Sequence, residues 1–481
     1  MRKVRVLHIS KYYHPFVGGT ELVARQCVRA LQGSVFEQAV ICFDHKGMKG
    51  ASAGEKSEDS VDLVDGVRVV RCACEAKIAS QSLSFSYRRR LQAVFDQFRP
   101  DIVVLHYPNP FAAHYLLSFL KPEQKLVIFW HLDIVKQKHL GKLFNAQNER
   151  LLERADRLIA ASPNYVEGSP WLRKYREKCV IIPDCIDDEN EDVRGKTAAS
   201  AGVITAGESP VGKTGSVGVQ DTEHTVNGTK PDETAQIEFF LRKRFAGKIL
   251  CLAVGRHVEY KGFRYLIEAA KYLDERFVII IAGAGPLTEE LKRQAENLPE
   301  LKSEASGRKT RTSEPQDQKK AGADEEIKPD SSKKSADSGY PQIIFAGLVP
   351  DGELRAYLHA CDIFCFPSIT KNEAFGIALA EAMYCGKPAV TFTIEGSGVN
   401  FVSLGGVTGI ECPNRDSRAY AEALLLLADR PDLRNQYGEA ARKRVEEHFL
   451  YRQFAGNIRQ LFRVLVSKKT DHTADAAGSS G

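Results

Sequence analysis

The chain has 481 residues, 43% of them hydrophobic, so it is long enough for more than one domain with a large core. Its 67 Lys and Arg residues against 62 Asp and Glu residues leave a net charge of +5, which is too small to indicate a nucleic-acid partner. No apolar run approaches the roughly 18 residues of a membrane span. The 11 cysteines lack zinc-site spacing, which favours buried thiols in a reducing cytosol.

The first ten residues predict a strand rather than a targeting segment. They begin with charged side chains, and neither a long apolar region nor a cleavage site follows. A secretory signal needs both. We therefore expect a cytoplasmic protein.

Apolar strands alternate with amphipathic helices through the first half of the chain. Strands are expected at Val4–Ile9, Ala39–Phe43, Val67–Arg71, Ile102–His106, Leu126–Trp130 and Arg157–Ala161, and helices at Glu21–Leu31, Tyr87–Gln97 and Lys142–Glu153. This alternation predicts a parallel sheet that is covered by helices on both faces.

A second series of the same kind begins near residue 248. Strands are expected at Leu250–Val254, Phe277–Ala282, Ile343–Ala346, Ile363–Pro367 and Pro388–Phe392, and helices at Phe263–Leu273, Leu287–Asn297, Asp351–His359, Phe375–Tyr384, Arg418–Ala428, Asp432–His448 and Tyr451–Val466. Two such series predict an α/β protein with two doubly wound, Rossmann-like domains that face each other across a cleft.

Two segments interrupt this pattern. Residues 187–234 are rich in Gly, Ser, Thr and Glu, and residues 302–339 are rich in Lys, Ser, Asp and Glu. Neither composition buries enough apolar surface to order itself, so disordered insertions are expected, with an interaction site as the alternative. Gly207–Thr214 matches the phosphate-loop pattern, but it contains Pro210 and has no flanking strand or helix, so we interpret the match as accidental.

The segment Ile369–Met383 carries two carboxylates, Glu373 and Glu381, around a turn of small residues. A helix is expected from Phe375, and the free backbone N–H groups at its start, near Phe375 and Gly376, would attract phosphate. Positions i and i+8 share one face, which places Glu381 about two turns below Glu373. Carboxylates beside an anion site suit a ligand with hydroxyl groups. A nucleotide sugar has both a diphosphate and hydroxyls.

Cations are available at the end of a neighbouring strand. Arg256 and Lys261 follow the expected strand Leu250–Val254. A guanidinium fork and a point charge are a common pair for binding a diphosphate. The alternative is a solvated loop with two ordinary surface cations, and the Glu373–Glu381 element favours the binding site over it.

Together, these residues resemble the signature of retaining glycosyltransferases of family GT4: Arg256 and Lys261 with Glu373 and Glu381. Proteins of this family have the GT-B fold and are typified by bacterial mannosyl- and glucosyltransferases. Further matches are Gly18-Gly19-Thr20-Glu21, Trp130-His131, Gly283-Ala284-Gly285-Pro286 and Thr408-Gly409. The resemblance covers nearly the whole chain except the insertions and the extreme tail. Three features depart from the family: Leu132 after the histidine, Asp184-Cys185 in place of a glycine, and the length of the insertions.

The resemblance implies a domain plan. It comprises an N-terminal acceptor domain (1–186), an insertion (187–236), a C-terminal donor domain (237–450) that contains the insertion 302–339, a helix that packs back on the N-terminal domain (451–467), and a flexible tail (468–481).

The resemblance also implies roles for individual residues. Arg256 and Lys261 would stabilise the leaving diphosphate, Glu373 would hold the donor hexose, and Glu381 would hold the ribose. His131 would contact donor or acceptor, although a lone histidine after a strand is more often structural. Nucleotide binding would also involve Phe375 and Gly376 at the helix start. Four further glycines would take part: Gly18 and Gly19, for which a plain turn is the alternative, and Gly283 and Gly285, for which close packing is the alternative.

The function implied is retaining transfer of a hexose from a nucleotide diphosphate sugar to a hydroxyl of a glycan or lipid-linked acceptor. GDP-mannose is favoured as the donor over a UDP-sugar, and no metal or other cofactor is expected. The alternatives are a sugar-nucleotide epimerase on the same fold and a non-catalytic nucleotide-sugar-binding protein. Arg88–Arg90 could contact anionic lipid at the inner membrane face, or form an ordinary solvated helix face.

Overall fold

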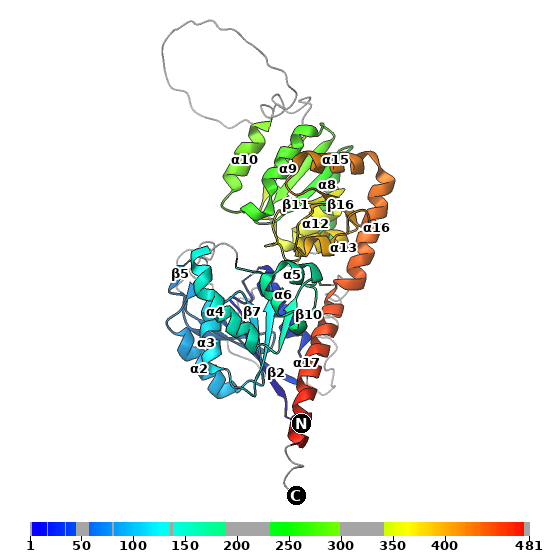
Figure 1. The fold of residues 1–481 in the computed structure, drawn as a ribbon. Coiled ribbons are helices and arrows are strands. Elements are labelled where there is room, and N and C mark those ends of the chain that lie inside the picture. The colour runs from blue at the N-terminus through cyan, green and yellow to red at the C-terminus, as the bar shows by residue number, and fades with distance from the viewer. Residues whose placement is uncertain are drawn as a thin grey trace, which may run out of the picture.

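The computed structural model describes residues 2–16, 18–33, 35–44, 57–78, 81–134, 138–187, 231–298 and 341–475. These residues form two α/β domains, each built on one large sheet. Figure 1 shows α16 (Pro431–His448) beside the C-terminal domain and α17 (Tyr451–Asp475) beside the N-terminal one. The predicted α/β class is confirmed.

The N-terminal sheet has eight strands in the order β10-β9-β8-β7-β1-β2-β4-β3, all parallel to their neighbours except β3. Its strands are β1 (Val4–Ile9), β2 (Phe36–Phe43), β3 (Ser60–Val64), β4 (Val67–Cys72), β7 (Ile102–Tyr107), β8 (Lys125–Trp130), β9 (Arg157–Ala160) and β10 (Cys179–Ile181); β5 (Ala76–Ile78) and β6 (Gln81–Leu83) form a separate hairpin. The helices are α1 (Gly19–Ala30), α2 (Tyr87–Phe98), α3 (Pro110–Phe119), α4 (Lys138–Arg154), α5 (Pro163–Gly168), α6 (Pro170–Lys174) and the short η1 (Arg176–Lys178).

The C-terminal sheet has six parallel strands in the order β13-β12-β11-β14-β15-β16. They are β11 (Ile249–Val254), β12 (Phe277–Ala282), β13 (Gln342–Gly347), β14 (Ile363–Phe366), β15 (Ala389–Phe392) and β16 (Gly409–Cys412). The helices are α8 (Pro231–Arg244), η2 (Glu259–Lys261), α9 (Phe263–Ala269), η3 (Ala270–Tyr272), α10 (Thr288–Glu296), α12 (Asp351–Ala360), α13 (Ile377–Tyr384), α14 (Val399–Val402) and α15 (Ser417–Asp429).

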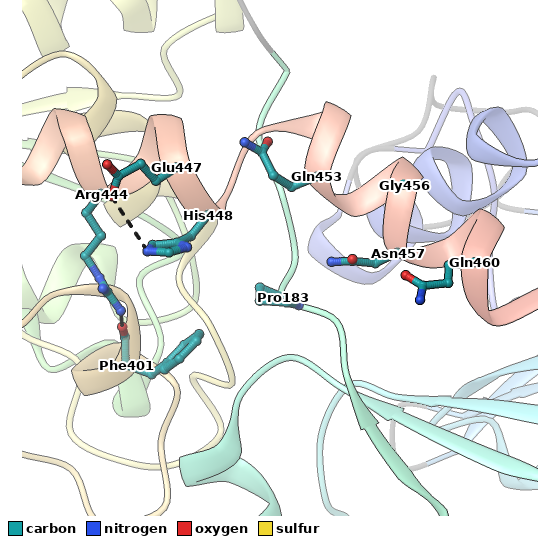
Figure 2. Close-up of a pocket in the computed structure, with 9 residues that line it drawn as sticks. All are labelled: Pro183, Phe401, Arg444, Glu447, His448, Gln453, Gly456, Asn457 and Gln460. Carbon is teal, nitrogen blue, oxygen red and sulfur yellow. Dashed lines mark hydrogen bonds and ion pairs between the residues drawn. The ribbon is translucent and has the colours of Figure 1, made fainter.

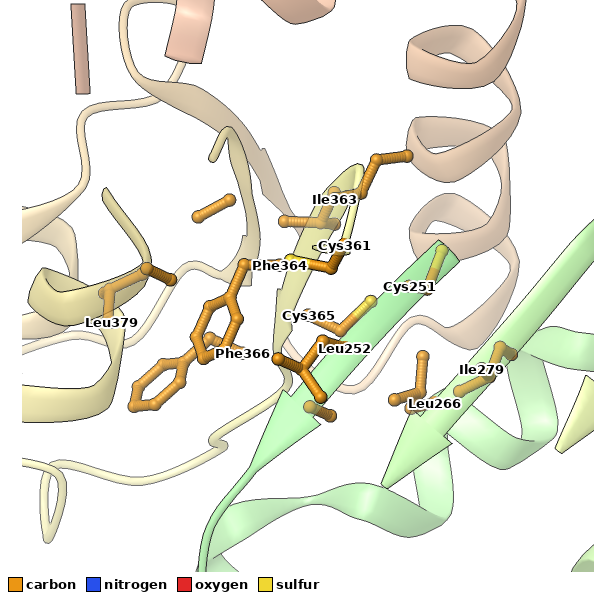
Figure 3. Close-up of a cluster of buried hydrophobic side chains, with 14 of the residues drawn as sticks. Cys251, Leu252, Leu266, Ile279, Cys361, Ile363, Phe364, Cys365, Phe366 and Leu379 are labelled. Atoms are coloured by element: carbon orange, nitrogen blue, oxygen red, sulfur yellow. The ribbon is translucent and has the colours of Figure 1, made fainter. Parts of the chain in front are cut away.

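The central strands are uninterrupted apolar runs because helices cover both faces of each sheet. Every residue of β12 is buried. Figure 3 shows part of the C-terminal core, where Leu252 and Phe364 of adjacent strands lie between Leu266 of α9 and Leu379 of α13. Burying side chains of this size stabilises the fold by about 1.5–3 kcal/mol each.

The chain crosses back to the N-terminal domain at its C-terminal end. Leu450 pairs with Ile186 in an isolated parallel bridge. Along α17, apolar side chains such as Phe454 and Phe462 then pack into the N-terminal core beside α1. The last helix therefore returns to the N-terminal domain, as the family resemblance implies.

Two boundaries differ from the domain plan. The helix α17 continues to Asp475, so residues 468–475 of the predicted flexible tail are helical, because a helix that is anchored by packing propagates readily. The helix α8 begins at Pro231, inside the predicted insertion, and proline suits a first helical position. The rest of both insertions, with the phosphate-loop match, lies outside the described residues.

Candidate functional site

The two motifs from the C-terminal half of the sequence meet beyond the carboxyl ends of β11 and β14. We call Ile369–Gly376 the donor loop. The Ile369 N–H donates to the carbonyl of Tyr260 at 2.9 Å, which joins the donor loop to η2. Ligand-binding residues of parallel sheets gather at this end. The fold therefore brings Arg256 and Lys261 close to Glu373, which lies more than a hundred residues further along the chain.

Lys261 and Glu373 are in direct contact. The Lys261 Nζ lies 2.6 Å from the Glu373 Oε2, and both side chains are largely buried. The Ser368 hydroxyl donates to the same oxygen at 3.0 Å, and the Lys261 ammonium lies 4.9 Å from the centre of the Phe366 ring. An ammonium has three N–H donors, so Lys261 can bond Glu373 and an anionic ligand at the same time.

A glycine makes this approach of η2 to β14 feasible. Gly262 ends η2 in the left-handed conformation at φ 64°, and a Cβ there would clash with the carbonyl oxygen of Pro367. Only glycine adopts this conformation without strain and without that clash. The position of Lys261 over Phe366 depends on it.

Arg256 lies in the same region with an exposed side chain. Burial raises the pKa of Tyr260, the Glu373 carboxylate raises it further, and the charges of Lys261 and Arg256 lower it. All three charged groups therefore act on one phenol. Two cations and one carboxylate gather around Tyr260.

The start of α13 differs from the sequence prediction. The helix begins at Ile377, not at Phe375, because Gly376 has φ 102° and ψ 71°, which no helical residue adopts. Glu373 lies in the donor loop, so the prediction that Glu373 and Glu381 share one helix face is wrong. Leu379 and Ala380 donate the first intrahelical bonds to Gly376, which leaves the N–H groups of the first helical residues outside those bonds.

The Phe375 side chain anchors the donor loop, and a part of Phe375 in nucleotide binding stays a prediction. Its side chain is 2% exposed and packs edge-to-face on Phe449, with 5.3 Å between ring centres. The Ser397 hydroxyl donates to the carbonyl of Glu373. Both contacts hold the backbone from which the Glu373 carboxylate projects.

Glu381 occupies a different environment from Glu373. Burial raises the pKa of its carboxyl group to about 7, and the Asp351 carboxylate at the start of α12 adds to the shift while Arg355 opposes it. The residue as a whole is only partly buried. Its carboxyl group is thus poised between its protonated and ionised forms near neutral pH.

The predicted glycines fall into two groups. Gly283 and Gly285 pack on the Arg256 loop, because Cβ atoms there would clash with the carbonyl oxygens of Gly255 and His257. This geometry accounts for both by close packing, and their part in nucleotide binding stays a prediction. Gly18 and Gly19 begin α1, and a Cβ on Gly19 would lie 3.8 Å from the Ile377 side chain at the start of α13. The starts of α1 and α13 therefore face each other.

His131 is buried in the N-terminal domain. Its Nε2 lies 3.1 Å from the Nδ1 of His106, and its ring stacks on Phe129 at 4.7 Å between centres. Burial lowers its pKa to about 3, so the imidazole is neutral at physiological pH. The structural alternative for this histidine thus has direct support, and its contact with substrate stays a prediction.

Two family models match most of the chain. The model described as "Glycosyl transferase 4-like domain" matches residues 18–185, and the model described as "Glycosyl transferases group 1" matches residues 236–302 and 327–444. O-antigen chain mannosyltransferase C of Escherichia coli is 28% identical over 468 residues, which cover 97% of this chain and 100% of that protein. The chain belongs to the GT4 family of glycosyltransferases.

One further sequence relative and two solved structures are also similar to this GT4 glycosyltransferase. D-rhamnosyltransferase WbpZ of Pseudomonas aeruginosa is 27% identical over 454 residues, which cover 93% of this chain and 92% of that one. Sucrose-phosphate synthase of Thermosynechococcus elongatus superposes with a TM-score of 0.66 at 16% identity, covering 97% of this chain and 100% of that one. Anabaena HepE, solved with UDP and glucose, gives 0.61 at 14% identity, covering 95% and 99%. The predicted family and the GT-B fold are confirmed.

A cavity of about 650 Å³ lies away from the candidate site of this glycosyltransferase. Figure 2 shows it where α16 meets α17, between Pro183, Phe401 and the side chains of Gln453, Asn457 and Gln460. None of the predicted site residues lines this cavity. We therefore do not assign the catalytic centre to it, although it is large.

Neither a metal cluster nor a membrane-spanning helix is present among the described residues. In the part of the chain that the structure describes, no three or more His, Cys, Asp or Glu side chains are grouped so that they could hold a metal ion. Among the described helices, none combines the length and the apolar character needed to cross a membrane.

Sequence reasoning missed two residues at the domain junction. Lys371 of the donor loop lies 2.8 Å from the Asp133 carboxylate of the N-terminal domain. Asp133 lies two residues after His131, and Lys371 lies two residues before Glu373 within the segment Ile369–Met383. Only their position next to motif residues could have drawn attention to them, because the contact spans 238 residues.

Proposed function

We propose that this glycosyltransferase is a retaining hexosyltransferase that uses a nucleotide diphosphate sugar. The acceptor is a hydroxyl of a glycan or lipid-linked glycan, and the product belongs to a surface polysaccharide. The observation that carries the proposal is the contact between Lys261 and Glu373 at the carboxyl ends of two strands, close to the start of α13. The names of the Escherichia coli and Pseudomonas aeruginosa relatives support the polysaccharide assignment.

The leaving group explains the cations. When the anomeric C–O bond breaks, negative charge develops on the diphosphate. Arg256, Lys261 and the free N–H groups at the start of α13 stabilise that charge by fixed, partly desolvated contacts. In this mechanism the side-chain cations take the part that a metal plays elsewhere, so neither a metal nor another cofactor is required.

The carboxylates bind hydroxyls. Glu373, held by Lys261 and Ser368, accepts hydrogen bonds from the donor hexose. Glu381 accepts hydrogen bonds from the ribose hydroxyls. In this proposal Gly19, which lies close to Ile377 at the start of α13, and its neighbour Gly18 close the nucleotide site from the N-terminal domain.

GDP-mannose is the favoured donor, and a UDP-sugar is the alternative. The mannosyltransferase relative supports the first, and HepE with UDP and glucose supports the second. A panel of radiolabelled nucleotide sugars, scored for binding and then for transfer to a glycolipid extract, tests the proposal. We expect one nucleotide class to bind and to lose its sugar to an acceptor. Binding of none, or conversion of the sugar without any acceptor, contradicts it.

The poised carboxyl of Glu381 predicts a pH dependence of donor binding. The ionised form accepts hydroxyl bonds better, and a carboxyl with a pKa of about 7 goes from mostly protonated to mostly ionised between pH 6 and 8. Nucleotide-sugar affinity should rise about tenfold over that range. Glu381→Gln should bind weakly and without this dependence. Calorimetry with intact nucleotide sugars measures both, and identical pH profiles would exclude Glu381 from the site.

We also propose that the enzyme docks peripherally on the cytoplasmic face of an anionic membrane. Phe85, 90% exposed, lies two residues before the start of α2, whose first residues include the exposed Arg88 and Arg89. Arg90 instead pairs with Asp59 at 3.0 Å, so it contributes less than its neighbours. An apolar side chain beside exposed cations suits an anionic lipid surface, where each cation contributes about 1 kcal/mol.

Flotation with anionic vesicles tests this docking. Arg88→Gln/Arg89→Gln and Phe85→Ser should each reduce binding at low salt, and added salt should reduce it for the wild type. Arg173→Gln/Lys174→Gln removes the same charge from α6 and should have little effect. Equal losses in both double variants would indicate general charge attraction instead of a docking surface.

A further inference from the structure

The two domains are joined by an ion pair at the donor loop. The Lys371 ammonium donates to the Asp133 Oδ2 and to the carbonyl of Gly168, both at 2.8 Å. Lys371 belongs to the C-terminal domain, and both acceptors belong to the N-terminal domain. One side chain therefore fixes the donor loop to the opposite domain at two points.

Asp133 is held rigidly by its own domain. Its Oδ1 accepts from the Trp130 indole N–H at 2.9 Å and from the Ser169 hydroxyl at 2.8 Å, and its backbone N–H donates to the Tyr165 hydroxyl at 2.7 Å. Its side chain is 7% exposed. These contacts leave Oδ2 directed at Lys371, so the acceptor is preorganised before the domains meet.

The backbone around the pair is shaped for close contact of the domains. Gly168 and Gly396 pack directly on each other, and a Cβ on either would clash with the backbone of the other. Ala374 of the donor loop packs against the N-terminal core. The arrangement at Lys371 is thus one part of a fitted junction, and Lys371 supplies its charged contact.

Lys371 is also coupled to the reacting centre. It precedes Glu373 by two residues in a loop whose backbone is tied at Ile369 and at Glu373. Glu373 in turn contacts Lys261. If the domains separate, Lys371 loses both partners and the donor loop keeps only its ties within the C-terminal domain.

We infer that Lys371 and Asp133 form a closure latch, which holds the two domains together and positions Glu373 for transfer. Lys371 and Asp133 are positioning residues, since they act through Glu373 and through the domain junction. The part that concerns Glu373 rests on the proposed function, whereas the part that concerns domain closure does not. Arg256 and Lys261, which bind the donor's diphosphate in this proposal, lie in the same domain as the donor loop, so most of the donor affinity remains when the latch opens and only the closing contribution of Gly18 and Gly19 is lost.

Two single variants and their combination test the latch. Lys371→Met removes the charge at similar volume, and Asp133→Asn keeps an oxygen for Trp130 and Ser169. Lys125→Met is the matched control, because Lys125 pairs with Asp156 at 3.0 Å inside the N-terminal domain. Lys371→Arg, which keeps the charge, should restore much of what Lys371→Met loses.

Small-angle scattering measures closure without reference to activity. We expect a larger radius of gyration for Lys371→Met and Asp133→Asn than for the wild type and Lys125→Met, and no further increase in the double variant. An unchanged radius of gyration in both single variants overturns the latch, whether or not the protein is a transferase.

Kinetics then test the coupling to Glu373. A misplaced loop should lower kcat by about a hundredfold, while the affinity for the nucleotide sugar changes little. The double variant should be no slower than the worse single variant. A loss of affinity equal to the loss of rate would mean that Lys371 binds the donor directly and would overturn the positioning role. Unchanged kcat in a folded Lys371→Met protein would do the same.

Discussion

Lys261→Ala should slow glycosyl transfer by at least about a hundredfold, which corresponds to roughly 3 kcal/mol of transition-state stabilisation. The Lys261 ammonium lies 2.6 Å from the Glu373 carboxylate and has further N–H donors for the leaving diphosphate. Removing it takes away a charge where negative charge develops and leaves the Glu373 carboxylate with the Ser368 hydroxyl as its remaining described hydrogen-bond partner. Arg256→Ala should have an effect of similar size.

Lys271→Ala is the matched control for this prediction. The side chains of Lys261 and Lys271 are both 14% exposed, and Lys271 pairs with Glu268 at 3.5 Å in the same domain. We expect normal turnover in Lys271→Ala, slow turnover in Lys261→Ala, and circular dichroism spectra that match the wild type for both. Wild-type turnover in Lys261→Ala and Arg256→Ala would remove both residues from the mechanism.

The buried histidines of the N-terminal domain should make the fold acid-sensitive. Burial lowers the pKa of His8 to about 4 and of His131 to about 3. In the unfolded chain these histidines become protonated below about pH 6.5, whereas in the folded protein they stay neutral until the pH is much lower. The free energy of unfolding therefore falls as the pH drops, by about 3 kcal/mol for His8 alone between pH 6.5 and 4.

His8→Leu isolates this contribution. The substitution also removes the hydrogen bond of 3.0 Å between His8 and Gln38, which can shift the absolute stability of the variant. The quantity to measure is therefore the pH dependence of the free energy of unfolding in urea. The fall in stability from pH 6.5 to 4 should be smaller by about 3 kcal/mol in His8→Leu than in the wild type. The exposed His114, changed to Gln, should leave the dependence unaltered. Parallel curves for wild type and His8→Leu would show that His8 titrates normally.

The sequence was sufficient for elements that bury both faces. Val4–Ile9 and Phe277–Ala282 match β1 and β12 to the residue, since a short, mostly apolar run between polar segments is typical of a buried strand. Elements with mixed composition were not predicted. The edge strand β3 alternates polar and apolar residues, with Leu63 76% exposed. The helix α3 begins at Pro110 and is capped by Asn109, so two prolines, Pro108 and Pro110, mark its start.

The site was predictable where charge and strand ends coincide. Arg256, Lys261 and Glu373 follow strands, and topology brings them together. The local backbone conformation was not predictable. The composition of Glu373-Ala374-Phe375 is helical, yet Gly376 has φ 102° and α13 begins only at Ile377. The contact of Lys371 with Asp133 depends on how two domains dock, and no local pattern encodes that relation.

Calorimetric titration of GDP and UDP in the presence of a metal chelator tests the central claim, that side-chain cations of the C-terminal domain bind the diphosphate. We predict that one of the two nucleotides binds the wild type with one site per chain, and that Arg256→Ala/Lys261→Ala weakens this binding by at least about a hundredfold. The claim is contradicted if neither nucleotide binds without a metal, or if the double variant binds as tightly as the wild type.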